Sequence, residues 1–409
     1  MRPPAGSKQP HSDASSVSRI DLPQICNGAN CHICDDCLTA VKVGTPRATH
    51  NSRATTVRAL EMPAMLDTAA SWPRAQSIRE RSGWIVTDGR MGTVAAASGV
   101  ASAIGLTFEH KQIANRATWS ILPARSILDP RDSGERPLTP PWPDIAIAAG
   151  NRTMPYLQAL RRVSEGATFT VALQHHVTQS DLADLIWCPA HEGHAGANII
   201  STLTTPHVMR PHALAALRNV RTPEICALPR PLVAVLIGGP DRYYRYDTQT
   251  LQRFGASLRK LADAGASFLI TPSRRTTAAL LRTAITATRD APRIIWNGRG
   301  PNPYWTFLAQ ADFTVVTGDS VSMVSEACVT GRPVYVFESS AGLGRIAKFH
   351  ESLQAHGATR PLTPDIDPRE QWRYRPLDAA PRIAAEIACR FNSPSAPHRP
   401  DVRLSATRS

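Results

Sequence analysis

The chain has 409 residues, of which 42% are hydrophobic and 19% charged, and its formal net charge is +13. This length suffices for two or three domains with separate cores. No apolar run approaches the 18 residues of a membrane span, and the first residues lack the apolar segment of a secretory signal, so we expect a cytoplasmic protein. The positive charge is spread out, which disfavours a nucleic-acid binder. It favours phosphate-bearing ligands or peripheral contact with the anionic inner face of a membrane.

Residues 1–80 are rich in Pro, Ser and Thr, which predicts a disordered tail. Four cysteines interrupt it with the spacing C-x4-C-x2-C-x2-C: Cys26, Cys31, Cys34 and Cys37. Four thiols this close can surround zinc or an iron–sulfur cluster, although zinc ribbons separate two pairs by a longer loop. A cysteine-rich tail without a metal fits the spacing equally well, so both alternatives stay open. Residues 393–409 are also predicted to be disordered.

From Trp84 onwards, predicted strands alternate with helices. In the first half the strands are 84–87, 144–148, 169–173 and 184–187, with helices ending near 104 and spanning 154–163. After a proline-rich joint near residue 230, strands at 232–237, 267–271, 293–296, 313–317 and 334–337 alternate with helices at 251–264, 276–288, 303–311 and 321–330. This order predicts an α/β protein with two doubly wound, Rossmann-like domains, 81–228 and 229–392. Ligands of such sheets bind at the carboxyl ends of the strands.

Three strand ends of the second domain suit phosphate. Ser320 is a candidate N-cap of the helix from Val321, and Ser322 lies in its first turn, where N–H groups attract anions. Glu326 lies one turn after Ser322 and could accept hydrogen bonds from a ribose diol; the alternative is an exposed glutamate on a capped helix. The other two ends carry Gly238 with Gly239, which allow close approach of a backbone, and Arg274 with Arg275, which suit phosphate.

The first domain carries candidate general bases at its own strand ends. Asp88 follows the first strand, His175 and His176 follow the strand at 169–173, and His191 with Glu192 follows the strand at 184–187. We take Asp88, His175 and His191 as the catalytic candidates, and the alternative for each is a structural or surface role. The histidines, together with His194, show no spacing typical of a metal site.

Several motifs resemble the mitochondrial-fission "elongated mitochondria" family, which has plant members and many bacterial ones. The matching stretches are Thr87-Asp88-Gly89-Arg90, Gly150-Asn151-Arg152-Thr153, Val235 to Pro240, Ser273-Arg274-Arg275-Thr276, Asn302-Pro303-Tyr304 and Asp319 to Ala327, extended by Gly331 to Val336. The resemblance implies a GT-B-like fold whose two domains face each other across a cleft. It also implies that Asn302, Ser320, Ser322 and Glu326 lie on the nucleotide-sugar side.

The resemblance implies a GT-B-type glycosyltransferase that binds a nucleotide-diphosphate sugar in its second domain and transfers the sugar to an acceptor that the sequence does not name. No cofactor is required, because Arg274, Arg275 and helix N-termini would meet the phosphate charge in place of a metal. The alternative is a non-catalytic adaptor on the same scaffold, since fold does not fix function.

Overall fold

The computed structural model describes residue 78 and residues 81–113, 138–173, 182–241, 244–339, 344–367 and 370–393. The four N-terminal cysteines, His175, His176 and the predicted tails, apart from Ile78 and Ser393, lie outside these residues. The metal centre and one catalytic candidate therefore stay predictions. Ile78 falls within the predicted disordered tail but is buried in the N-terminal core. In the part described, no helix is both long and apolar enough to cross a membrane.

The N-terminal domain is a parallel six-stranded sheet with the strand order β2-β1-β3-β4-β5-β6. Its strands are β1 (Ser82–Thr87), β2 (Thr107–Gln112), β3 (Ile145–Ala149), β4 (Phe169–Leu173), β5 (Leu185–Pro189) and β6 (Ile199–Thr202). Helices α3 (Met91–Ile104) and α4 (Met154–Val163) and the short 3-10 helices η3 (Asn151–Thr153) and η4 (Ala190–Glu192) lie between them. β3 and β4 are buried at every position, as expected for parallel strands covered on both faces.

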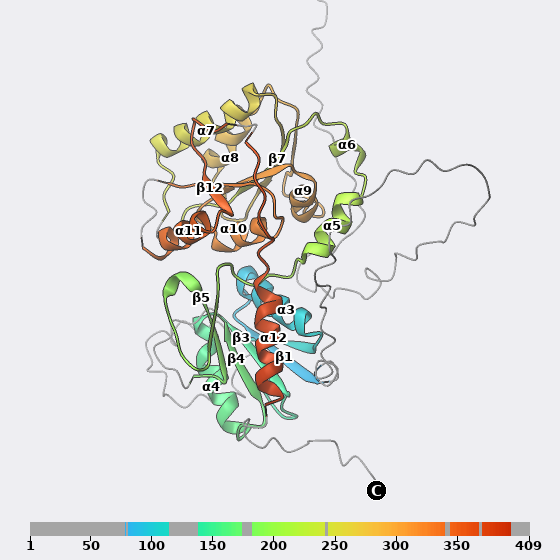
Figure 1. Ribbon diagram of the computed structural model, residues 1–409, viewed down its shortest axis with the longest axis vertical. Coiled ribbons are helices and arrows are strands. Elements are labelled where there is room, and N and C mark those ends of the chain that lie inside the picture. Colours follow the sequence, from blue (N-terminus) through green and yellow to red (C-terminus); the bar gives the residue numbers. More distant parts are fainter. Residues whose placement is uncertain are drawn as a thin grey trace, which may run out of the picture.

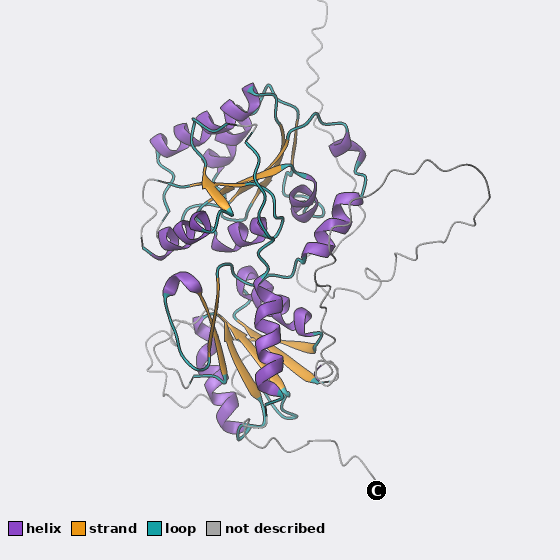
Figure 2. Ribbon diagram, in the orientation of Figure 1, coloured by secondary structure: helices purple, strands orange, loops and turns teal. Residues whose placement is uncertain are grey.

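The C-terminal domain repeats this plan with the strand order β12-β11-β10-β7-β8-β9, again all parallel. Its strands are β7 (Leu232–Ile237), β8 (Ser267–Pro272), β9 (Arg293–Ile295), β10 (Phe313–Thr317), β11 (Val334–Phe337) and β12 (Thr359–Pro361). Its helices are α7 (Thr248–Asp263), α8 (Ala278–Ala287), α9 (Tyr304–Gln310), α10 (Val321–Cys328) and α11 (Arg345–Ala355). Figure 2 shows helices on both sides of each sheet. The predicted GT-B-like class, two doubly wound α/β domains, is confirmed.

Two crossings connect the domains. The first contains α5 (Pro211–Asn219) and α6 (Pro223–Cys226), and the second leads into the last helix, α12 (Ala379–Phe391). Figure 1 shows α12, in red, lying on the N-terminal domain beside α3. Ala380 and Ile383 of α12 belong to the N-terminal core together with Ile85 and Val100. The predicted boundaries placed this helix in the second domain by sequence order, whereas its apolar face is buried against the first.

Each sheet has one point where the strand order reverses, and in doubly wound sheets ligands bind there, beyond the carboxyl ends of the strands. In the N-terminal sheet this switch point lies between β1 and β3, where Thr87 pairs with Ala149. In the C-terminal sheet it lies between β7 and β10, where Leu236 pairs with Val316. The motifs that begin with Thr87, Gly150, Val235 and Asp319 therefore surround the two switch points, although they are far apart in sequence.

Candidate functional site

At the N-terminal switch point, Asp88 is held by the start of α3. Its Oδ1 accepts hydrogen bonds from the Thr93 hydroxyl at 3.0 Å and from the Arg90 N–H at 3.3 Å. Its Oδ2 lies 3.2 Å from Nε of Arg90, and only 3% of the Asp88 side chain is exposed. A Cβ at Gly150 would lie 3.1 Å from Thr93 and 3.7 Å from Asp88. Asp88 therefore stands at the predicted strand end, but its carboxylate already orders the turn into α3.

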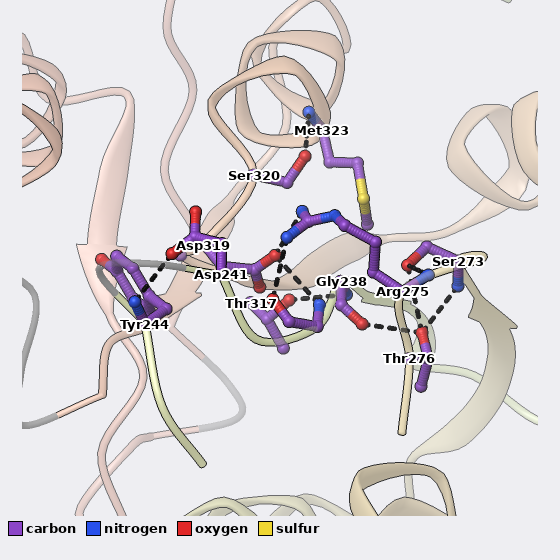
Figure 3. A network of polar contacts seen from close by, with 12 residues as sticks. Gly238, Asp241, Tyr244, Ser273, Arg275, Thr276, Thr317, Asp319, Ser320 and Met323 are labelled. Atoms are coloured by element: carbon purple, nitrogen blue, oxygen red, sulfur yellow. Dashed lines mark hydrogen bonds and ion pairs between the residues drawn. The ribbon is translucent and has the colours of Figure 1, made fainter. Parts of the chain in front are cut away.

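At the C-terminal switch point, the Asp319 carboxylate joins three loops (Figure 3). It accepts hydrogen bonds from the Gly239 N–H at 2.9 Å and from the Tyr246 hydroxyl at 2.7 Å. A guanidinium N–H of Arg275 donates to it at 2.6 Å, and the Asp319 side chain is fully buried. Gly238, Gly239 and Arg275 thus converge around an internal carboxylate that we did not predict as a site residue. Its position between a strand end and a capping serine was the available signal.

The two glycines are required by this packing. A Cβ at Gly238 would lie 2.2 Å from a carboxylate oxygen of Asp319, and one at Gly239 would lie 2.0 Å from the carbonyl oxygen of Arg275. The Gly238 N–H donates to the Thr317 hydroxyl at 2.7 Å. Close packing of the protein itself therefore explains both glycines, and their contact with a diphosphate stays a prediction. Arg274, on the same turn as Arg275, is exposed.

Helix α10 begins where the two domains meet. Ser320 is its N-cap, as predicted, and its hydroxyl accepts a 3.4 Å hydrogen bond from the Met323 N–H. A Cβ at Gly92, in the first turn of α3, would lie 3.3 Å from the Ser322 hydroxyl. The starts of α3 and α10 are thus neighbours across the domain interface. Each leaves first-turn N–H groups without an acceptor inside the helix, so two partial positive charges come together here.

Further along α10, Glu326 is paired with Tyr304, the first residue of α9. The Tyr304 hydroxyl donates to a carboxylate oxygen of Glu326 at 2.5 Å, and the Asn302 side chain accepts the Tyr304 N–H at 3.1 Å. Burial raises the pKa of Glu326 to about 7, although the hydrogen bond from Tyr304 opposes this shift. Asn302 and Glu326, both predicted, are therefore linked through Tyr304, which sequence reasoning missed although it adjoins Asn302 in a quoted motif.

His191 and Glu192 lie on η4, against α11 of the other domain. The His191 ring is 5.4 Å from the Phe349 ring, and Glu192 lies 3.5 Å from the Arg345 guanidinium. Burial lowers the pKa of His191, while Glu192 raises it. β1 and β5, the strands that Asp88 and His191 follow, are three strand spacings apart in the sheet, which is about 14 Å. These two candidates do not form one catalytic pair.

Metal ligands are not grouped in the described part of the chain. None of its His, Cys, Asp and Glu side chains gather in threes around a point that could hold an ion.

Comparison with known proteins identifies relatives in plants and bacteria. The family model described as Mitochondrial fission ELM1 matches residues 91–391. The chain is 34% identical over 277 residues to the mitochondrial fission protein ELM1 of Arabidopsis thaliana, covering 61% of this chain and 65% of that protein. It is 30% identical over 160 residues to the uncharacterized protein RP120 of Rickettsia prowazekii, covering 38% of this chain and 45% of that protein. The matches thus span less than two thirds of either relative.

Solved structures resemble the chain more loosely. A putative UDP-N-acetylglucosamine 2-epimerase from Listeria monocytogenes matches with a TM-score of 0.45 and 13% identity, covering 78% of this chain and 98% of that one. A likeness of this degree assigns neither a ligand nor a reaction to the chain.

Proposed function

The chain belongs to the Mitochondrial fission ELM1 family, and we propose that it is a GT-B-type glycosyltransferase that binds a nucleotide-diphosphate sugar where its two domains meet. The observation that carries this proposal is the contact between the starts of α3 and α10, with Ser322 beside Gly92. Each helix starts at the switch point of its own sheet. Two helix N-termini that converge on one place form a site for an anion with more than one charge.

The diphosphate is proposed to bind at these helix starts. Ser320 satisfies only the Met323 N–H, so the N–H groups of Val321 and Ser322 are available to phosphate oxygens. The Ser322 hydroxyl adds a donor, and Arg274 on the neighbouring loop supplies an exposed positive charge. Arg275 contributes less, because its guanidinium is already bound to Asp319 and to the carbonyl oxygen of Gly239.

The ribose is proposed to bind at Glu326. This residue lies on the same helix face as Ser322 and about 6 Å further along the axis, which matches the step from a phosphate to the ribose of one nucleotide. Two ribose hydroxyls would donate to the ionised carboxylate, with Tyr304 holding it in place. Because the pKa of Glu326 is about 7, a ribose that needs the ionised form should release a proton when it binds near neutral pH.

In the transfer itself, the bond between the anomeric carbon and the diphosphate oxygen breaks, and a bond to an acceptor oxygen forms. The acceptor proton passes to a base on the N-terminal side, for which Asp88, His175 and His191 are the candidates. The nucleoside diphosphate leaves with the bonding electron pair, and the helix N-termini stabilise its growing charge without a metal.

Isothermal titration of the full-length chain with UDP, GDP and their sugars tests the proposal. We expect one diphosphate to bind, and at pH 7 the heat should depend on the ionisation enthalpy of the buffer because Glu326 releases a proton. Ser322→Ala should weaken diphosphate binding about tenfold and leave nucleoside binding nearly unchanged. The matched control is Ser102→Ala, at an exposed position in the last turn of α3. A folded protein that binds none of these nucleotides would refute the proposal.

The second candidate function is that of a non-catalytic adaptor. The surroundings of Asp88 and His191, the two candidate bases that the structure describes, favour it. The Asp88 carboxylate already forms an ion pair with Arg90 and accepts a hydrogen bond from Thr93, and the His191 ring packs on Phe349. Turnover assays of Asp88→Ala, His175→Ala and His191→Ala separate the two functions. If one substitution abolishes sugar transfer while nucleotide binding survives, the adaptor is excluded. If the wild type binds nucleotide sugar but transfers it to no acceptor or water, the adaptor is preferred.

A further inference from the structure

At the opposite edge of the C-terminal sheet, where its strands begin, three arginines lie close enough to Arg332 to act on it electrostatically. Arg230 precedes β7, Arg332 precedes β11, Arg218 lies near the end of α5 and Arg373 lies in the second crossing. Asp312, which precedes β10, forms an ion pair with Arg230. We call these five residues the arginine cluster. Because β7 has six residues, the cluster lies about 20 Å from Gly238 along the strand, so it is separate from the proposed nucleotide site.

The two inner arginines are fixed by carbonyl groups at helix ends. Arg218 donates to the carbonyl oxygens of Thr330 at 2.8 Å and Ala309 at 3.3 Å. Arg332 donates to the carbonyl oxygen of Ala311 and, at 3.5 Å, to that of Ala309. Both guanidinium groups therefore converge on the carbonyl oxygen of Ala309, which places two positive charges side by side on an ordered scaffold.

This arrangement compensates the positive charge only in part. Carbonyl oxygens satisfy N–H groups but carry no net charge, and the ends of α9 and α10 supply roughly half a negative charge each. In the described part of the chain, Arg218, Arg332 and Arg373 have no carboxylate within ion-pair distance. Burial, together with repulsion from Arg218, Arg373 and Arg230, lowers the pKa of Arg332 to about 10, and Asp312 opposes this shift. Burial and then Arg373 lower the pKa of Arg218 as well.

We propose that the arginine cluster is a second anion site, which binds a phosphate group carrying two negative charges. Guanidinium groups bind phosphate oxygens through paired N–H donors, and a dianion would offset the charge that four arginines and one aspartate leave. Arg218 and Arg332, held by the helix ends, form the fixed floor of the site. The exposed Arg230 and Arg373 close on the phosphate from its rim.

The rim arginines allow a test that leaves the helix caps intact. The variant combines Arg230→Gln with Arg373→Gln, and the matched control combines Arg259→Gln on α7 with Arg282→Gln on α8, both exposed. Binding of inorganic phosphate and pyrophosphate to the full-length chain is measured by isothermal titration at constant ionic strength, with chloride as the supporting anion. We expect the rim variant to bind at least tenfold more weakly than the wild type, and the control to bind within twofold.

The phosphate group could belong to a lipid headgroup or to a soluble phosphate ester. A flotation assay with phosphatidic acid vesicles and with phosphatidylserine vesicles of equal charge density distinguishes these two sources. Capture by phosphatidic acid that depends on the rim arginines would assign the site to a lipid headgroup. Phosphate binding without such capture would assign it to a soluble phosphate ester. Equal phosphate affinity in the rim variant, the control and the wild type would overturn the proposal. Circular dichroism and the urea midpoint confirm that each variant is folded.

Discussion

The pKa of Glu326 predicts how the stability of this protein depends on pH. Burial raises that pKa from its ordinary value of 4.5 to about 7, so folding favours the protonated carboxyl group. The associated stability is fully present below pH 4.5 and is lost as the pH rises through 7. Each pKa unit corresponds to about 1.4 kcal/mol. With some screening because the side chain is partly exposed, the loss is about 2–3 kcal/mol.

Glu326→Gln should remove this dependence. Glutamine stays neutral at every pH and can still accept the hydrogen bond from the Tyr304 hydroxyl. We expect the variant and the wild type to have similar free energies of unfolding at pH 4, and the variant to be about 2–3 kcal/mol more stable at pH 8. Urea titrations at both pH values measure this difference, in which the titration of all other groups cancels.

Glu351→Gln is the matched control, because Glu351 is exposed on α11 and should give the same difference from the wild type at both pH values. If Glu326→Gln also gives an unchanged difference, burial does not govern this carboxyl group. The proton release proposed for nucleotide binding would then lose its basis.

Three further predictions concern the packing around the site. Ser320→Ala should lower the free energy of unfolding by about 0.5–1 kcal/mol in urea titration, because its 3.4 Å cap hydrogen bond is long. Asp319→Asn should lower the free energy of unfolding by about 2 kcal/mol in the same assay, because the buried carboxylate loses its charge-assisted hydrogen bonds while water partly screens Arg275. Arg275 should also react faster with a reagent that modifies arginine. An unchanged urea midpoint would contradict the role of Asp319 in joining the loops. Burial, then Arg210, lowers the pKa of His207 to about 4, so its stability contribution is present above pH 6.5 and lost as the pH falls to 4. His207→Leu should therefore flatten the decline of urea midpoints between pH 6.5 and 4.5, and an equally steep decline would show that another group dominates.

The two doubly wound domains could be predicted from the amino-acid sequence. Parallel strands buried on both faces must be apolar at nearly every position, as in β7, and such runs alternate visibly with helical segments. The Ser320 cap could also be predicted, because capping is a local interaction between a side chain and the next turn. Short or half-exposed edge strands such as β2 and β12 were missed because they lack a continuous apolar run.

The neighbours of each predicted residue, in contrast, became known only from the folded structure. Gly239, Arg275 and Asp319 come from three loops, and nothing local showed that the carboxylate would take the donors expected to bind phosphate. The packing of α12 on the N-terminal core likewise depends on which apolar surface is available, not on its place in the sequence. Local sequence patterns indicate the hydrophobic period of a helix or strand and where it ends. Contacts between elements that are distant in sequence depend on how their faces pack. For that reason the strand ends were predictable from sequence and their partners were not.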